Sequence, residues 1–153
     1  YRVGWLLPGK FEESAKRIKR AQSCSTPMLQ QWTLTDYLMS GEYDRHLQVL
    51  RKTLRYNSER MRSLVAEHFP KEVCISQPQG GSVLWIRCRS HVDTSKFFTQ
   101  AIAKGVSFAP GEIFSPSGKY KNFMRISYGV KWCEKVDQAV ADLGKLVYDY
   151  PEN

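Results

Sequence analysis

The sequence of 153 residues has no apolar run long enough to cross a membrane, and its first residues do not resemble a signal peptide. We therefore expect a cytoplasmic protein with no membrane partner. The sequence also has no internal repeat and no low-complexity segment. With 42% hydrophobic residues, it is long enough for one domain with a real core, or for one domain plus the remnant of another.

Cysteine and histidine are scarce, with four and three residues respectively. The cysteines (Cys24, Cys74, Cys88 and Cys133) lie too far apart to spell out a zinc knuckle or a redox pair. We expect buried, reduced thiols instead. The histidines (His46, His68 and His91) show no metal-ligand spacing either, so the sequence predicts no metal site.

Acidic residues are outnumbered by basic ones, 15 against 23, which gives a formal net charge of +8 and a pI near 9.4. Such a balance permits an anionic partner, which could be a nucleic acid, a phosphate-bearing cofactor or a carboxylate ligand. Charge alone does not choose among these three classes.

The N-terminal part begins with "YRVGWLLPG", which predicts a short apolar strand stopped by proline and glycine. The chain thus starts as if cut from a longer protein. Apolar residues at helical spacing then predict a basic amphipathic helix over 10–22. A second helix is expected over 28–40, with Pro27 in its first turn and Ser25 or Thr26 as its cap.

The longest helical pattern runs over 42–69, where leucines and methionines recur in steps of three and four residues. A helix of this length reaches roughly 40 Å, which is more than one small domain needs. It is therefore expected to connect two domains. Its many arginines (Arg45, Arg51, Arg55, Arg60 and Arg62) predict a solvated face, with a nucleic-acid surface as the alternative.

Beyond Pro70 the pattern changes to short strands. "VCISQ" and "SVLWIRC" predict two strands joined by a turn, and "DTSKFFTQAIAKG" predicts a helix capped by Asp93 and ended by Gly105. "VSFAPG" and "NFMRISYG" predict two further strands, and a terminal helix ends before Pro151. The fold class is therefore α/β, with an α+β small domain in which helices pack on a small mixed sheet beside the long helix.

One strand, 123–128, carries an arginine in its middle. Because side chains alternate along a strand, Phe123, Arg125 and Ser127 are expected on one face and the intervening residues on the other. A guanidinium on a rigid strand suits bidentate binding of a carboxylate. An arginine at a strand edge, or one paired with a structural carboxylate, explains the pattern as well.

Several segments together resemble the C-terminal part of fold-type I aminotransferases, which depend on pyridoxal 5'-phosphate (PLP). They are "YRVGW", the helix that starts "YDRHL", "QPQGGSVLWI" and "GVSFAPGEIFSPSGKYKNFMRISYG". The resemblance covers essentially the whole chain. The "YDRHL" helix and the "PQGG" hairpin are most similar to the effector domains of the MocR subfamily of GntR-type transcriptional regulators, and 2-aminoadipate aminotransferases are also similar.

The resemblance implies roles for four residues. Arg2 matches the arginine that contacts the phosphate of PLP, and Arg125 matches the arginine that grips the ligand's α-carboxylate. Gly80 and Gly81 match a turn beside the substrate, although a plain hairpin turn explains them equally well. For Tyr120 and Asn122, which flank the loop before the strand, we expect a structural role, with a contact to the ligand as the alternative.

The resemblance also implies what the chain does not contain. The lysine that forms the Schiff base with PLP lies before the matched region, so the chain has no catalytic residue, should be inactive alone and is not expected to retain PLP alone. DNA binding is expected from an N-terminal winged helix-turn-helix outside the chain. Residues 1–41 are interpreted as a remnant of the large cofactor-binding domain with a helical connection, and 42–153 as the small domain.

Three functions are consistent with these residues. The chain is expected to be the effector- and cofactor-sensing part of a PLP-binding GntR/MocR-type regulator, which binds DNA and an amino-acid or other carboxylate ligand as a homodimer. The first alternative is a fragment of a 2-aminoadipate-like aminotransferase. The second is a self-standing basic domain that binds nucleic acid. The net positive charge favours it, but the sequence contains no nucleic-acid-binding motif.

Overall fold

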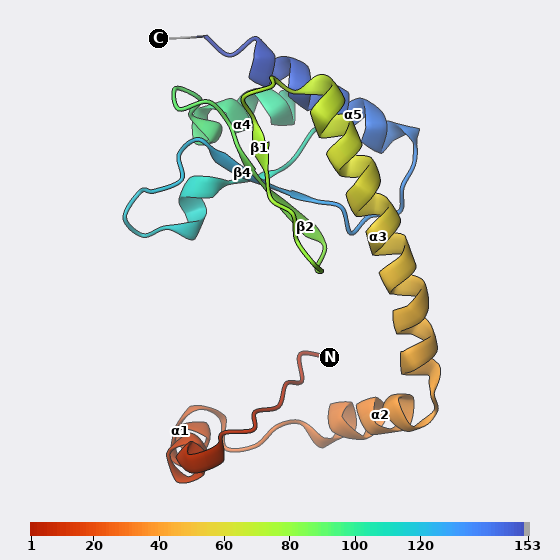
Figure 1. Ribbon diagram of the computed structural model, residues 1–153. Coiled ribbons are helices and arrows are strands. Elements are labelled where there is room, and N and C mark those ends of the chain that lie inside the picture. Colours follow the sequence, from red (N-terminus) through yellow and green to blue (C-terminus); the bar gives the residue numbers. More distant parts are fainter. Residues whose placement is uncertain (152–153) are drawn as a thin grey trace. The chain divides into compact units, whose positions relative to one another are not determined.

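The computed structural model describes residues 1–151 of the chain (Figure 1). It divides into two units, Tyr1–Val49 and Leu50–Asn153. None of the helices in the described residues combines the length and hydropathy that a membrane crossing requires.

The first unit contains two helices, α1 (Glu12–Ser23) and α2 (Met28–Met39), with a short 3-10 turn, η1 (Gly9–Phe11), before α1. Both helices were expected. The expected strand at the start of the chain is wrong, because residues 1–8 form no strand and pair with none in the described residues. A strand needs a partner for its backbone groups, and none is present. The expected cap of α2 is also wrong, because its N-cap is Pro27, which has no side-chain hydrogen bond.

The first unit has no core of its own, because none of its residues is buried. Large apolar side chains remain exposed throughout it, among them Trp5, Leu7, Leu29, Trp32 and Met39. A unit of this kind is stabilised within itself mainly by local contacts. One is the double ion pair of Lys16 with Glu12 at 2.7 Å and Glu13 at 3.3 Å, which raises the pKa of Lys16.

The long helix α3 spans Glu42–His68, 27 residues, as the sequence pattern predicts. Its buried residues all fall in its second half and belong to the second unit; they are Asn57, Met61, Leu64 and Val65. The apolar residues of α3 therefore recur at helical spacing because one side of its C-terminal half packs into the core of the second unit.

The second unit is built around a four-stranded sheet in the order β1-β2-β4-β3. The strands are β1 (Cys74–Ile75), β2 (Val83–Arg87), β3 (Ala109–Pro110) and β4 (Phe123–Ser127). Together with two helices, α4 (Thr94–Ala103) and α5 (Glu134–Tyr148), they give the expected order β-β-α-β-β-α. Every pairing among the described strands is antiparallel, which corrects the expectation of a mixed sheet.

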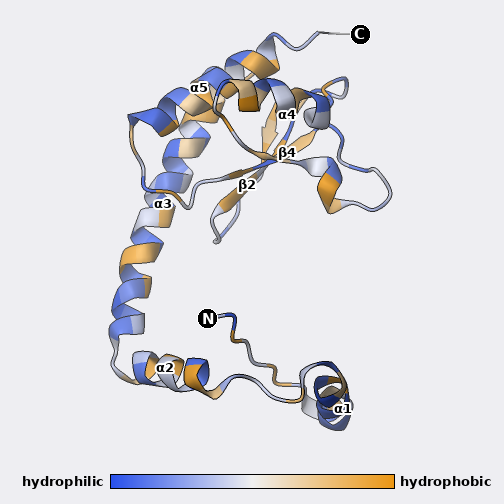
Figure 2. Ribbon diagram, turned by 180° about the vertical axis from the view of Figure 1, so that it is seen from behind, coloured by the Kyte–Doolittle hydropathy of each residue, from blue (hydrophilic) through white to orange (hydrophobic). Residues whose placement is uncertain are grey.

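The core of the second unit lies on one face of this sheet. Leu84 and Ile86 of β2 and Met124 of β4 are fully buried there, in one cluster with side chains from α3, α4 and α5. Figure 2 shows apolar strands beside helices with polar outer sides. Asp93 caps α4 as predicted, because its carboxylate accepts hydrogen bonds from the amides of Ser95 and Lys96.

Helices α3 and α5 approach each other closely at Gly144. A Cβ atom placed on Gly144 would lie 2.5 Å from the carbonyl oxygen of His68, which is backbone and cannot swing aside. Only glycine therefore fits this position of α5 without moving the end of α3.

The cysteines differ from the expectation of buried thiols. All four are free, but only Cys88 is buried, while Cys24, Cys74 and Cys133 are exposed. Burial raises the pKa of Cys88 to about 12, so this thiol stays protonated and unreactive. Composition gave no means of distinguishing a core position from an exposed one for the other three.

An ion pair joins α3 to α5 at the edge of the second unit. Arg60 donates to both carboxylate oxygens of Asp137, at 3.3 and 3.0 Å, and the indole of Trp132 donates to the same carboxylate at 2.9 Å. The Arg60 hydrogen bond is the main cause that lowers the pKa of Asp137 below its ordinary value of 3.8, and the Trp132 bond adds to it.

We predict that Asp137 contributes a small stabilisation that depends on pH. Because its folded-state pKa is lowered, the contribution is fully present above the ordinary carboxyl pKa and is lost as the pH falls through the folded-state value. The melting temperature of Asp137→Asn should therefore lie below that of the parent at pH 7, and the two should converge towards pH 2. The control is Asp149→Asn, which replaces an exposed carboxylate at the C-terminal end of α5. The difference between its melting temperature and that of the parent should not shrink in this way as the pH falls.

Candidate functional site

The face of the sheet opposite the core carries Arg125. Along β4, Met124 and Ile126 are buried while Arg125 and Ser127 are exposed, so the predicted alternation is confirmed. The register places Arg125 between Trp85 of β2 on one side and Ala109 of β3 on the other. The guanidinium thus lies on an inner strand and not at a sheet edge.

The side chain of Arg125 makes no hydrogen bond or ion pair with any described residue. Its contact is with an aromatic ring, since the guanidinium carbon lies 4.6 Å from the centroid of Phe114. A cation–π contact covers one flat side of a guanidinium and leaves the N–H groups at its edge able to donate. The geometry therefore gives Arg125 a fixed orientation with its fork free for a carboxylate.

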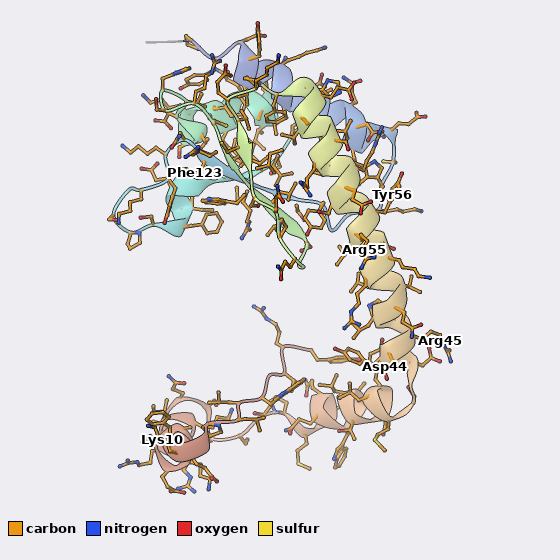
Figure 3. The ribbon with its side chains drawn as sticks, in the orientation of Figure 1. Lys10, Asp44, Arg45, Arg55, Tyr56 and Phe123 are labelled. Atoms are coloured by element: carbon orange, nitrogen blue, oxygen red, sulfur yellow. The ribbon has the colours of Figure 1, made fainter. Side chains whose placement is uncertain are left out.

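Phe114 belongs to an aromatic cluster on the same side of the sheet as Arg125. The ring of Trp85 lies 5.4 Å from Phe123 in a stacked arrangement and meets Phe114 and Tyr120 edge-on at 5.5 and 5.7 Å. Phe123, labelled in Figure 3, also contacts Tyr120 edge-on at 5.4 Å. Arg125 itself remains exposed, so a ligand carboxylate could reach the guanidinium beside these rings.

The loop that brings Phe114 and Tyr120 to the sheet depends on Gly111. A Cβ atom on Gly111 would overlap the carbonyl oxygen of Tyr120 and lie 2.7 Å from the Cβ of Phe123. Glu112, next to it in the 3-10 turn η2 (Gly111–Phe114), accepts a hydrogen bond from the hydroxyl of Ser95 at 3.0 Å. The motif "PGEIF" therefore packs the loop tightly against β4 before it reaches Arg125.

Tyr120 and Asn122 both make contacts within the second unit. The side-chain amide of Asn122 donates to the main-chain carbonyl of Cys88 at 2.8 Å. The main-chain carbonyl of Asn122 accepts from the main-chain amide of Cys88, also at 2.8 Å. Tyr120 adopts a left-handed backbone with φ of 64° and leaves its ring half-exposed in the aromatic cluster.

Gly80 and Gly81 lie in the turn between β1 and β2. The hydroxyl of Tyr128 donates to the carbonyl of Gly81 at 3.0 Å. Gly81 has a φ of +88°, a conformation that favours glycine. Both glycines line a groove of about 470 Å³ against α3, and Arg125 is not among the residues that line it. The groove therefore brings the two glycines together with α3 and not with Arg125.

Asn57 fixes α3 to the end of β4. Its buried side-chain amide donates to the carbonyls of Tyr128 and Val130 at 2.8 and 2.9 Å. Through Tyr128 this contact supports the glycine turn as well. Sequence reasoning assigned no role to Asn57, although a polar residue at a core position of a helix is itself a signal.

Arg2 lies in the first unit. It is exposed, has a left-handed backbone with φ of 59°, and makes no hydrogen bond or ion pair with the described residues. An unpaired guanidinium of this kind is free to bind a phosphate. Among the described residues, no group of three or more histidine, cysteine, aspartate or glutamate side chains could hold a metal ion.

Comparison with known proteins gives these residues a context. No family model matches the chain. The chain is 33% identical over 147 residues to the uncharacterized HTH-type transcriptional regulator YjiR of Escherichia coli, and 32% identical over 149 residues to YdcR of the same organism. These matches cover 96% and 97% of the chain, which spans about a third of the length of either relative.

Among solved structures, α-aminoadipate aminotransferase LysN of Thermus thermophilus, complexed with N-(5'-phosphopyridoxyl)-L-leucine, superimposes with a TM-score of 0.81. It is 26% identical, and the match covers 91% of this chain and 36% of LysN. The chain is thus similar, in sequence and in fold, to the C-terminal part of fold-type I aminotransferase-like proteins. These similarities confirm the resemblance to aminotransferases and to MocR-type regulators that the motifs indicate. They also confirm the fold class, except that the sheet is antiparallel and not mixed.

Proposed function

We propose that this aminotransferase-like chain is the C-terminal part of a PLP-binding GntR/MocR-type transcriptional regulator and senses an effector or the cofactor. The observation that carries the proposal is the similarity to two HTH-type regulators, 33% and 32% identical, across nearly the whole chain. The intact protein would bind DNA through a winged helix-turn-helix N-terminal to this chain, and would act in the cytoplasm as a homodimer.

The division of the chain supports this assignment. Residues 1–41 are proposed to belong to the large cofactor-binding domain, and 42–153 to form the small domain that begins with α3. The first unit has no buried residue and exposes Trp5, Leu7 and Trp32. Exposed apolar side chains of this kind are expected in a segment that packs against another domain. The second unit has a continuous core.

Arg2 is proposed to hold the phosphate of PLP, and its unpaired guanidinium fits that group. A planar fork matches phosphate oxygens bidentately, and the residue carries no competing carboxylate. The cofactor would supply an electron sink for chemistry at the Cα of an amino acid. The lysine that holds its aldehyde is proposed to lie outside this chain, so the chain alone should neither transaminate nor retain PLP.

Arg125 is proposed to bind the α-carboxylate of an amino-acid ligand. Its guanidinium is oriented by Phe114, faces away from the core and has no structural carboxylate as a partner. By fixing one end of the ligand, it would orient the bonds at Cα. Gly80 and Gly81 are proposed to allow close approach of a ligand or a neighbouring backbone at the turn.

An amino-acid aminotransferase of the 2-aminoadipate type is the second candidate. The superposition on LysN, 26% identical with a TM-score of 0.81, favours it. Both candidates use the same two arginines, so no residue of this chain separates them. The proposed difference is the N-terminal winged helix-turn-helix of the regulator.

The test combines the sequence of the intact protein with one binding experiment. The regulator requires a winged helix-turn-helix upstream of the PLP lysine, and the intact protein should retard its own promoter DNA in a gel shift that an amino acid or PLP alters. An intact protein without such a region, which converts an amino acid and a 2-oxo acid with bound PLP, is the aminotransferase.

A further inference from the structure

A groove of about 470 Å³ runs between α3 and the turn that joins β1 to β2, entirely within the second unit. One wall is α3, which contributes Arg51, Arg55, Glu59 and Arg62, and the other is the turn Pro78, Gln79, Gly80 and Gly81. Its volume falls within the range of small-molecule sites, roughly 300 to 1,000 Å³.

The arginines of α3 divide into two groups. Arg45 pairs with Glu42 at 2.6 Å and Arg60 with Asp137 at 3.0 Å, as expected for a solvated face. The side chains of the three groove arginines (Arg51, Arg55 and Arg62) make no ion pair or hydrogen bond with any described residue. Their charges are therefore available.

The spacing of these three arginines places them on one side of the helix. Positions four and seven residues apart differ by less than a quarter turn, so Arg51, Arg55 and Arg62 form one row. Glu59 lies in the same groove without an ion-pair partner among the described residues. The groove thus has a net charge of two positive units, which a dianion would neutralise.

The opposite wall offers further donors. In the described structure the amides of Gln79, Gly80 and Gly81 donate no hydrogen bond, and a Cβ atom on either glycine would meet nothing within 4 Å. Successive free amides in a turn favour anions. The turn is held in place because the buried Tyr128 donates to the carbonyl of Gly81 at 3.0 Å.

We propose that this groove binds a small phosphate-bearing dianion, at a site separate from Arg125 and from the cofactor phosphate at Arg2. Guanidinium forks match phosphate oxygens, and the turn amides complete the shell from the other side. The proposed ligand is a small molecule and not duplex DNA, because the turn 78–81 forms a second wall opposite the arginines of α3.

The test is calorimetric titration of PLP-loaded intact protein with pyrophosphate and inorganic phosphate, so that the cofactor site is already filled. Arg55→Gln and Arg62→Gln should each weaken phosphate binding about tenfold or more, because each removes a charge-assisted contact. Glu59→Gln should strengthen it, because it removes a negative charge. Arg60→Gln is the matched control, since Arg60 lies on α3 outside the groove, and it should leave the affinity unchanged.

Thermal unfolding of the same proteins, with and without phosphate, gives a second measurement of binding. Saturable phosphate binding should also protect the parent against thermal unfolding, and Arg55→Gln should lose that protection. Absence of saturable binding, or equal affinities in all four variants, rules the site out. If the groove variants instead lose only salt-dependent affinity for DNA, the row of arginines is a nucleic-acid surface. Arg125→Lys should not change phosphate binding, which separates this site from the proposed amino-acid site.

Discussion

Replacing Arg125 with lysine is expected to weaken amino-acid binding to the intact protein about ten- to a hundredfold while leaving the fold intact. Lysine keeps the positive charge but loses the planar fork that holds both carboxylate oxygens. The side chain is exposed on the outer face of β4 and contributes nothing to the core, so its loss should not unfold the protein. Its contact with Phe114 should weaken as well, because lysine has no flat face to lay on the ring.

The measurement is a titration of PLP-loaded intact protein with an amino acid, followed by the absorbance of the bound cofactor. Arg87→Lys is the matched control, because Arg87 is exposed on the same side of β2 and pairs in the register with Phe123. It should bind the ligand as the parent does. Cofactor affinity should be the same in all three proteins, since Arg2 and not Arg125 is proposed to hold the phosphate.

Two results would return Arg125 to a structural role. One is an equal ligand affinity of Arg125→Lys and the parent. The other is a variant that simply unfolds, which would mean that the guanidinium stabilises the loop through Phe114 and does not bind a ligand. A parallel measurement of thermal unfolding distinguishes the two.

Most elements of the fold were predictable because their signals are local. Helix α3 appears as apolar residues at helical spacing over its whole length, and the turn and cap residues marked β2 and α4. The strand expected at the start of the chain failed because a strand is defined by its partner, which local sequence does not supply. The antiparallel arrangement of the sheet is likewise a property of pairing and not of any one strand.

The site shows the same division. Alternation along β4 sufficed to place Arg125 on the outer face, because the period of a strand is fixed. Its neighbours could not be predicted, since Trp85 reaches it through the β2–β4 register and Phe114 through the fold of a loop. Nor could spacing tell the paired Arg60 from the unpaired Arg55, labelled in Figure 3, because the partner Asp137 comes from another helix.

Replacing Asn57 with leucine is expected to lower the free energy of unfolding by about 2 to 4 kcal/mol. The buried amide is the donor for the carbonyls of Tyr128 and Val130, at 2.8 and 2.9 Å, and leucine would leave both without it. An unsatisfied buried acceptor loses its hydration without compensation. Since Tyr128 also supports Gly81, the turn of the phosphate groove should loosen too.

Denaturant unfolding of the intact protein measures this effect, with Tyr56→Leu as the control. Tyr56 is the neighbour of Asn57 on α3, is 60% exposed and contributes nothing to the core, so its replacement should change stability by about 0.5 kcal/mol or less. Asn57→Leu should also weaken pyrophosphate binding more than Tyr56→Leu does, because only Asn57 connects to the turn through Tyr128. If the Asn57→Leu protein is as stable as the parent, the packing of leucine offsets the two lost hydrogen bonds. The polar contact would then not be what holds α3 to the end of β4.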